Sequence, residues 1–413
     1  MSSSLPFSER VMIAFFILLM LIGGAAMGWT ISAIPADFWH DIATFSQISS
    51  GAATRKFSKK INQDFVFSQP LHQTERVVSW LLTGDWGPGV REGCDGWLFL
   101  RDELMRYPDA QAAASMRLRA GIVQQLAHTL AAQKIQLMVV LVPDKSRIES
   151  AHLCGLHRSD SFAGRAQEWI HLTGLPVLGT ELGVELHAVD DEQGSAIQGG
   201  IIQGSTIVDL TPLLKQQSGA RFYRTDSHWN EAAAAQSAQA IARYLHGLHW
   251  IASINNTTGV TDIRDVSLEV HSVMKLRPGD LFHLATLDQL PAWLGPKPEL
   301  TMQSIWNGGA SPSTAGADDL FGDVDLPKIV LVGTSFSLRS NFFNALQHAV
   351  GVPLANVAKD GGEFDGAMRD YLSSATFKQT PPHVIIWEIP ERMLQAPSKP
   401  VEQQWSDHLK LQM

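Results

Sequence analysis

Short runs of consecutive apolar residues alternate along the chain with longer segments rich in alanine and leucine. Residues 135–142 (IQLMVVLV) and 383–387 (HVIIW) are almost continuously apolar, which is typical of strands buried on both faces of a sheet. Residues 112–133 and 230–248 are Ala-rich and long enough for helices. The alternation predicts an α/β fold with a doubly wound, mostly parallel sheet.

The remaining segments continue this alternation. Strands are predicted over residues 206–210, 328–332 and 356–358, and helices over 162–172, 338–350 and 363–374. Residues 251–327 break the rhythm and predict an irregular insertion. The last residues, 396–413, are polar and predict a peripheral tail.

The N-terminal part has a different pattern. Residues 11–34 contain no charged side chain and exceed the roughly 20 residues that a helix needs to span a bilayer. Arg10 precedes this run and no Lys or Arg follows until Arg55, so the positive-inside rule predicts a cytoplasmic segment 1–10 and export of everything after the helix. The alternative is a cleaved signal peptide, whose apolar core is usually about 7–15 residues long. The longer run favours an uncleaved anchor.

Between the predicted anchor and the compact body lies a polar and basic stretch. Residues 35–85 predict a partly helical stalk, and the glycine-rich residues 84–89 (GDWGPG) mark its end. We therefore predict a body over residues 86–395, which carries the insertion.

The composition of the chain argues against several classes of function. The net charge is −9 and no Lys/Arg-rich block occurs, which argues against binding to nucleic acid. CxxC, HExxH, GxGxxG and Walker patterns are missing, so the sequence predicts neither a metal nor a nucleotide cofactor. Cys94 and Cys154 are the only cysteines and can form one disulfide in an oxidising compartment or remain two separate thiols.

One candidate for chemistry follows a predicted strand directly. Ser335 lies in residues 333–337 (GTSFS), where a strand turns into a helix and free amides favour a developing negative charge. Gly333 permits a tight turn. The alternative role for Ser335 is a plain helix N-cap, because serine is preferred there.

A second candidate precedes the Ala-rich helix. Asp226 and His228 are two residues apart, so that Asp226 can orient His228 as the base that a serine nucleophile needs. The alternative is a surface loop in which Asp226 caps a helix. Gly361, in residues 359–362 (KDGG), can offer an oxyanion-binding amide or form a simple turn, and Glu388 ends the last strand at the same predicted edge.

Six segments together resemble one family, the alginate O-acetyltransferases of the AlgJ and AlgX type, whose catalytic domain has an SGNH-hydrolase-like α/β fold. They occur in the family's order: residues 95–99 (DGWLF), 142–145 (VPDK), 223–229 (YRTDSHW), 279–281 (GDL), 333–337 (GTSFS) and 387–392 (WEIPER). One position departs from the pattern, because Glu149 stands where a tyrosine is expected. The short chain after Arg392 resembles the membrane-anchored AlgJ type, since the AlgX type carries an additional carbohydrate-binding module.

The resemblance implies a role for each matching residue. Ser335 is expected to be the nucleophile, His228 the general base and Asp226 its orienting partner. Gly361 is expected to contribute an oxyanion-hole amide. We expect three residues in or beside these motifs to contact substrate: Lys145, Trp229 and Glu388.

The resemblance also implies a function and a location. The expected activity is O-acetylation of a bacterial exopolysaccharide, alginate or alternatively cellulose, through an acetyl-serine intermediate and without a cofactor. Expected partners are the polysaccharide, a membrane-bound O-acyltransferase that delivers acetyl groups, and other proteins of an exopolysaccharide complex. The catalytic domain would face the periplasm from a single-pass anchor in the inner membrane. Two other classes stay open, an acetyl-esterase with the same residues and a non-catalytic adaptor of an export complex.

Overall fold

The computed structural model describes residues 7–65, 67–178, 204–216, 218–251, 269–291, 293–307 and 327–411. The chain divides into two compact units, Met1–Gly87 and Pro88–Met413.

The described part of the first unit consists of helices and the short segments that connect them. Helix α1 (Phe7–Ser32) contains a stretch, Val11–Ser32, that is long and apolar enough to cross a membrane. The helices that follow are α2 (Ala36–Ile42), α3 (Phe45–Ser49), α4 (Ala52–Asp64) and α5 (Ser68–Thr83). The predicted stalk is therefore helical over most of its length, and α5 ends at Gly84, whose φ of 70° suits glycine.

The second unit is built on a six-stranded parallel sheet with the order β4-β5-β3-β10-β8-β9. Its strands, in that spatial order, are Val177–Leu178, Ser205–Asp209, Gln136–Val142, Val384–Pro390, Ile329–Val332 and Leu354–Asn356. Each predicted strand is present within a few residues. The doubly wound α/β prediction is thus confirmed.

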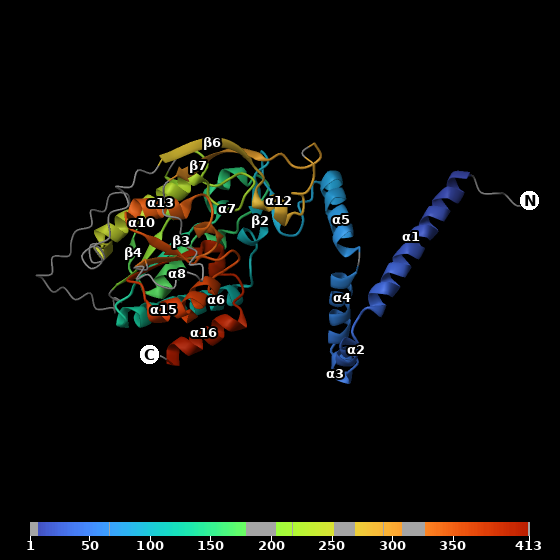
Figure 1. Cartoon of the computed structure of the whole chain (residues 1–413), viewed down its shortest axis with the longest axis horizontal. Coiled ribbons are helices and arrows are strands. Elements are labelled where there is room, and N and C mark those ends of the chain that lie inside the picture. Colours follow the sequence, from blue (N-terminus) through green and yellow to red (C-terminus); the bar gives the residue numbers. More distant parts are fainter. Residues whose placement is uncertain are drawn as a thin grey trace, which may run out of the picture. The chain divides into compact units, whose positions relative to one another are not determined.

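Helices cover both faces of this sheet, as Figure 1 shows. One face packs on α10 (Glu231–Gly247) and α13 (Phe342–Val350). The other packs on α6, α8, α14, α15 and α16, which span Asp109–Ala132, Arg165–Thr173, Gly366–Ser373, Ala375–Gln379 and Pro400–Leu411. Strand β3 sends Met138 and Val140 to the first face and Leu137, Val139 and Leu141 to the second, so its continuous apolar run fills two cores.

Helix α13 begins later than its apolar pattern predicts. The pattern starts at Leu338, whereas the helix starts at Phe342. Ser340 and Asn341 adopt positive φ angles of 58° and 53°, which a helix cannot accommodate. Asn341 instead donates from its side chain to Glu231 and to the Ser304 carbonyl.

The C-terminal segment corrects one prediction, because residues 400–411 are not peripheral. In α16, Trp405 and Leu409 are four residues apart and both are buried against α6. Arg119 of α6 and Glu402 form a buried ion pair with a distance of 2.7 Å from Nε to Oε2. The mostly polar composition of this segment led to the wrong prediction, because the apolar stripe of Trp405 and Leu409 is narrow.

The insertion is a second correction, because its described part is regular. Strands β6 (Glu269–Arg277) and β7 (Glu299–Asn307) pair antiparallel over nine residues each. Helix α12 (Asp280–Leu284) follows β6 directly. Figure 1 shows this ribbon lying outside the central sheet.

A short hairpin and a disulfide lie near the start of the second unit. Strand β1 (Val90–Glu92) pairs antiparallel with β2 (Leu98–Leu100). Cys94 and Cys154 form a disulfide that closes a loop with a sequence separation of 60. Of the two alternatives, the structure thus shows the bonded pair, and a loop of that size contributes on the order of 4 kcal/mol in the chain-entropy model.

Candidate functional site

Glu388 holds the turn that carries Ser335 through hydrogen bonds. Thr334 and Ser335 follow β8, and Ser335–Ser337 form one 3₁₀ turn. Glu388, near the end of the neighbouring β10, accepts hydrogen bonds from the Thr334 amide (2.7 Å) and the Ser337 hydroxyl (3.1 Å). A Cβ atom at Gly333 would lie 2.5 Å from Glu388 Oε2, so only glycine fits at this point.

This arrangement corrects the expectation that Glu388 contacts substrate. Its side chain is fully buried under the turn, and burial raises the pKa of the carboxyl. The acceptor positions of Glu388 serve the backbone and side chains of the turn. Glu388 therefore orients the segment that carries Ser335.

Asp226 and His228 lie in a closed loop that precedes α10. A β-bridge between Phe222 and Trp229 closes this loop, and the Tyr223 amide donates to the His228 carbonyl across it. Glu149, the residue that departs from the family pattern, accepts from the Phe222 amide at 3.0 Å and so fixes the start of the loop.

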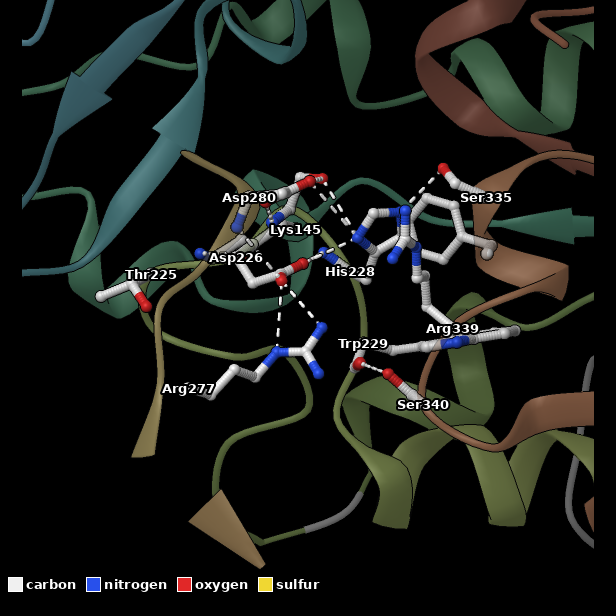
Figure 2. A network of polar contacts seen from close by, with 12 residues as sticks. Lys145, Thr225, Asp226, His228, Trp229, Arg277, Asp280, Ser335, Arg339 and Ser340 are labelled. Atoms are coloured by element: carbon white, nitrogen blue, oxygen red, sulfur yellow. Dashed lines mark hydrogen bonds and ion pairs between the residues drawn. The ribbon is translucent and has the colours of Figure 1, made fainter. Parts of the chain in front are cut away.

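The loop brings the predicted triad together, as Figure 2 shows. His228 Nδ1 lies 2.7 Å from Asp226 Oδ1, and His228 Nε2 lies 2.7 Å from Ser335 Oγ. Asp226 and His228 are buried and Ser335 is half-buried. An imidazole with a carboxylate on one nitrogen and a hydroxyl on the other can remove the hydroxyl proton and generate a nucleophile.

Three residues of the insertion complete the site, and sequence reasoning assigned none of them a role. Arg277 donates to Asp226 Oδ2 (2.9 Å), Asp280 accepts from the Ser227 amide (2.7 Å), and Glu299 accepts from the Arg224 amide (2.8 Å). Although burial opposes it, the hydrogen bond from His228 and the charge of Arg277 hold the pKa of Asp226 well below its ordinary value. The GDL motif was the available signal for Asp280.

The insertion approaches the loop so closely that glycine is required at position 279. A Cβ atom there would lie 1.8 Å from the Thr225 carbonyl oxygen. The glycine of the GDL motif therefore allows Asp280 to reach the loop that holds His228.

Lys145 and Trp229 correct two further expectations of substrate contact. The Lys145 ammonium is fully buried and donates to the carbonyl oxygens of Leu98, Arg224 and Asp226. Burial lowers its pKa to about 8. The Trp229 ring is also fully buried, with its centroid 5.3 Å from the Phe336 ring and 4.8 Å from the Phe342 ring. Both residues support the loop and do not line its surface.

The buried ammonium leads to a prediction about stability. Lys145→Met keeps an unbranched side chain of nearly the same length but leaves three buried carbonyl oxygens without their donor. We expect the free energy of unfolding to fall by on the order of 3 kcal/mol, measured by urea denaturation. The control Lys378→Met changes an exposed lysine and should alter stability by no more than about 0.5 kcal/mol. Equal stability of the two variants would contradict this role of Lys145.

The segment that carries Gly361 is tied to the Ser335 turn at two points. The Lys359 amide donates to the Gly333 carbonyl at 3.0 Å, and Arg339 donates to Asp360 at 2.9 Å. Gly361 is exposed and has a φ of 65°, a conformation that favours glycine. The structure thus places the KDGG turn next to the Ser335 turn.

A pocket of about 470 Å³ opens beside the imidazole. Its lining combines three groups of side chains: the acidic Asp226, Asp280 and Asp288, the basic Lys275, Arg277, Arg339, His228 and His283, and the neutral Tyr223, Leu276, Pro278, Thr301 and Gln303. Asp226, His228 and Asp280 offer ligand atoms within 4.8 Å of one another. These atoms are engaged with each other, with Arg277 and with Ser227, which is the pattern of a hydrogen-bonded acid–histidine pair.

Known proteins resemble this chain in sequence and in fold. Residues 90–175 and 188–391 match the sequence model of a family described as the SGNH hydrolase-like domain of acetyltransferase AlgX. The chain is 28% identical over 386 residues to a Pseudomonas aeruginosa protein named probable alginate O-acetylase AlgJ. This alignment covers 91% of this chain and 87% of that protein. A Pseudomonas putida protein of the same name is 30% identical over 323 residues, which are 77% of this chain and 73% of that protein.

A solved structure shows the same fold. The O-acetyltransferase domain of Pseudomonas putida AlgJ superposes with a TM-score of 0.56 and 25% sequence identity. The alignment covers 79% of this chain and 100% of that domain.

Proposed function

Because the chain belongs to the SGNH hydrolase-like acetyltransferase family of the AlgX type, we propose that it transfers acetyl groups to alginate through an acetyl ester of Ser335. The relatives named probable alginate O-acetylase suggest the polymer. The observation that carries the proposal is the contact of 2.7 Å between His228 Nε2 and Ser335 Oγ, with Asp226 on the other ring nitrogen.

The reaction proceeds in two steps. His228 Nε2 takes the proton of Ser335 Oγ while Oγ bonds to the acetyl carbonyl carbon, and the bond from that carbon to the donor breaks as the donor leaves with the proton from His228. A sugar hydroxyl then gives its proton to His228 and attacks the same carbon. Ser335 Oγ leaves and recovers the proton, which completes the cycle.

The oxyanion formed in each step needs donors next to Ser335. The Ser335 amide lies at the start of the turn, and the Gly361 amide belongs to the segment bonded to Gly333. We assign the oxyanion hole to these two amides. Glu388 and Thr334 hold the turn in place while charge develops.

The pocket favours an acidic polymer over cellulose. Arg277 is paired with Asp226, Arg339 with Asp360, and His283 with Asp288. In the described part of the chain, Lys275 has no carboxylate within 4.0 Å and so remains available to a uronate carboxylate of the acceptor.

Removal of this cation should weaken binding of the acidic acceptor. For Lys275→Gln we expect KM for polymannuronate oligosaccharides to rise roughly 3- to 10-fold with little change in kcat, because the lost contact is an exposed ion pair. The control Lys297→Gln alters an exposed lysine outside the pocket and should leave KM unchanged. An equal rise in KM for neutral cello-oligosaccharides would count against recognition of charge.

The test of the function is acetylation by the full chain in detergent. Polymannuronate oligosaccharides and p-nitrophenyl acetate are incubated with the protein, and mass spectrometry measures the acetylated sugar while released acetate is assayed in parallel. Transfer should exceed acetate release. Acetate release alone would indicate an esterase, and absence of both products would indicate an adaptor.

The first unit suggests where this reaction takes place. We assign Val11–Ser32 of α1 as the anchor in the inner membrane, with residues 1–10 in the cytoplasm and the acetyltransferase unit in the periplasm. The disulfide between Cys94 and Cys154 supports an oxidising compartment. A membrane-bound O-acyltransferase that delivers acetyl groups and other proteins of an exopolysaccharide complex are the partners that we propose.

A further inference from the structure

The Asp226 carboxylate is shared between His228 and a permanent cation. Oδ1 accepts from His228, while Oδ2 lies 2.9 Å from Arg277 Nη2 and 3.3 Å from Arg277 Nε. Arg277 also lies over the Tyr223 ring, 4.5 Å from its centroid. Because a guanidinium stays charged at all ordinary pH values, Arg277 offsets much of the negative charge that Asp226 presents to the imidazole.

A second carboxylate approaches the same imidazole. Asp280 Oδ2 lies 3.4 Å from His228 Nδ1. The Ser227 hydroxyl donates to Oδ2 at 2.5 Å and the Ser227 amide to Oδ1 at 2.7 Å, so Asp280 is held in this position. Burial and the charge of Asp226 raise the pKa of Asp280. The negative charge of Asp280 is therefore opposed by burial and by Asp226, and a protonated His228 favours it.

Resting on the acetyl-serine mechanism proposed above, we propose that Asp280 is a second positioning residue for His228. It restores the negative charge that Arg277 offsets at Asp226 and stabilises the imidazolium that forms when Ser335 gives up its proton. A contact that is stronger with the imidazolium than with the neutral ring acts on the transition state. Other charged groups near this cluster are Lys145, whose ammonium bonds the Asp226 carbonyl, and Glu299, which bonds the Arg224 and Thr225 amides. The same pocket is also lined by Arg339, Lys275, His283 and Asp288.

The proposal predicts how charge substitutions combine. Asp226, Arg277 and Asp280 together carry one net negative charge. Asp280→Asn leaves no net charge, Arg277→Gln leaves two negative charges, and the double variant again leaves one. The double variant should therefore be faster than Asp280→Asn alone, whereas two purely structural losses would accumulate.

The experiment measures acylation of Ser335 in the full chain in detergent, from the burst of p-nitrophenolate that p-nitrophenyl acetate releases. For Asp280→Asn we expect the rate constant of acylation to fall roughly 10- to 100-fold, with the half-saturating concentration of p-nitrophenyl acetate almost unchanged. The acidic limb of its pH–rate profile should move to lower pH, because the protonated imidazole loses a negative neighbour. Arg277→Gln/Asp280→Asn should recover part of the lost rate.

Two results would overturn the inference. One is an Asp280→Asn variant with a rate within about twofold of the original protein and an unchanged pH profile, and the other is a double variant slower than Asp280→Asn. If circular dichroism shows that Asp280→Asn does not fold, Ser227→Ala takes its place, because it keeps the carboxylate but removes the hydrogen bond of 2.5 Å. That variant should lose several-fold in acylation rate, and an undiminished rate would also overturn the inference.

Acylation of Ser335 and transfer to polymannuronate are scored separately. Loss of transfer with intact acylation contradicts the proposed function and leaves the role of Asp280 standing. Normal transfer by the original protein, together with no effect of Asp280→Asn on acylation, contradicts the role of Asp280 and leaves the proposed function standing.

Discussion

Replacing Ser335 with alanine should lower the rate of acetyl transfer by roughly three to six orders of magnitude. The hydroxyl lies 2.7 Å from His228 Nε2, and no acetyl ester can form at this position without it. Members of a nucleophile–base pair act as a unit, so removing the nucleophile removes nearly the whole catalytic advantage of the pair. The measurement is acetylation of polymannuronate oligosaccharides by mass spectrometry, together with labelling by a serine-reactive probe.

A matched control separates chemistry from folding. Ser373→Ala removes an exposed hydroxyl that donates to the Asp370 carbonyl. It should retain the full rate and the full probe labelling. Acetyl transfer by Ser335→Ala at a rate close to that of the control would refute the acetyl-serine mechanism.

Asp226→Asn should lower kcat by about three to four orders of magnitude with a small change in KM. A carboxylate accepts the proton on Nδ1 and stabilises the imidazolium, whereas an amide provides no charge and can turn its NH₂ group toward the ring. The substitution also leaves Arg277 without the carboxylate that it pairs with at 2.9 Å. The rate of acylation from p-nitrophenyl acetate measures the loss directly.

The pH dependence of folding stability follows from the depressed pKa of Asp226. Since the folded pKa is below the unfolded one, the stability that this carboxylate contributes is complete above the ordinary aspartate value of about 4. This stability is lost as the pH falls toward the depressed pKa.

The control for Asp226→Asn is Asp109→Asn, which removes an exposed partner of Arg106 and should leave kcat unchanged. A normal kcat for Asp226→Asn would show that His228 does not depend on this carboxylate.

One physical reason explains why the three residues expected to contact substrate do not line the site. Lys145, Trp229 and Glu388 each lie in or beside a motif, but all three are fully buried and hold the segments that carry His228 and Ser335. A motif can therefore mark a support of the site as well as its surface. Sequence spacing does not distinguish these two roles, because exposure depends on which segments pack over a residue.

The sequence by itself determined five of the six strands of the central sheet, several of the helices that cover it, and the candidates Asp226, His228 and Ser335. Continuous apolar runs and helix-length Ala-rich segments are local signals, and strand-to-helix turns carry their chemistry at predictable positions. The tertiary structure alone decided which groups meet. It placed Ser335, more than a hundred residues away along the chain, against His228. It also brought Asp280 from the insertion to the same imidazole and Arg277 to the Asp226 carboxylate. Contacts between distant segments depend on how the whole chain packs, which no local pattern of apolar and polar residues records.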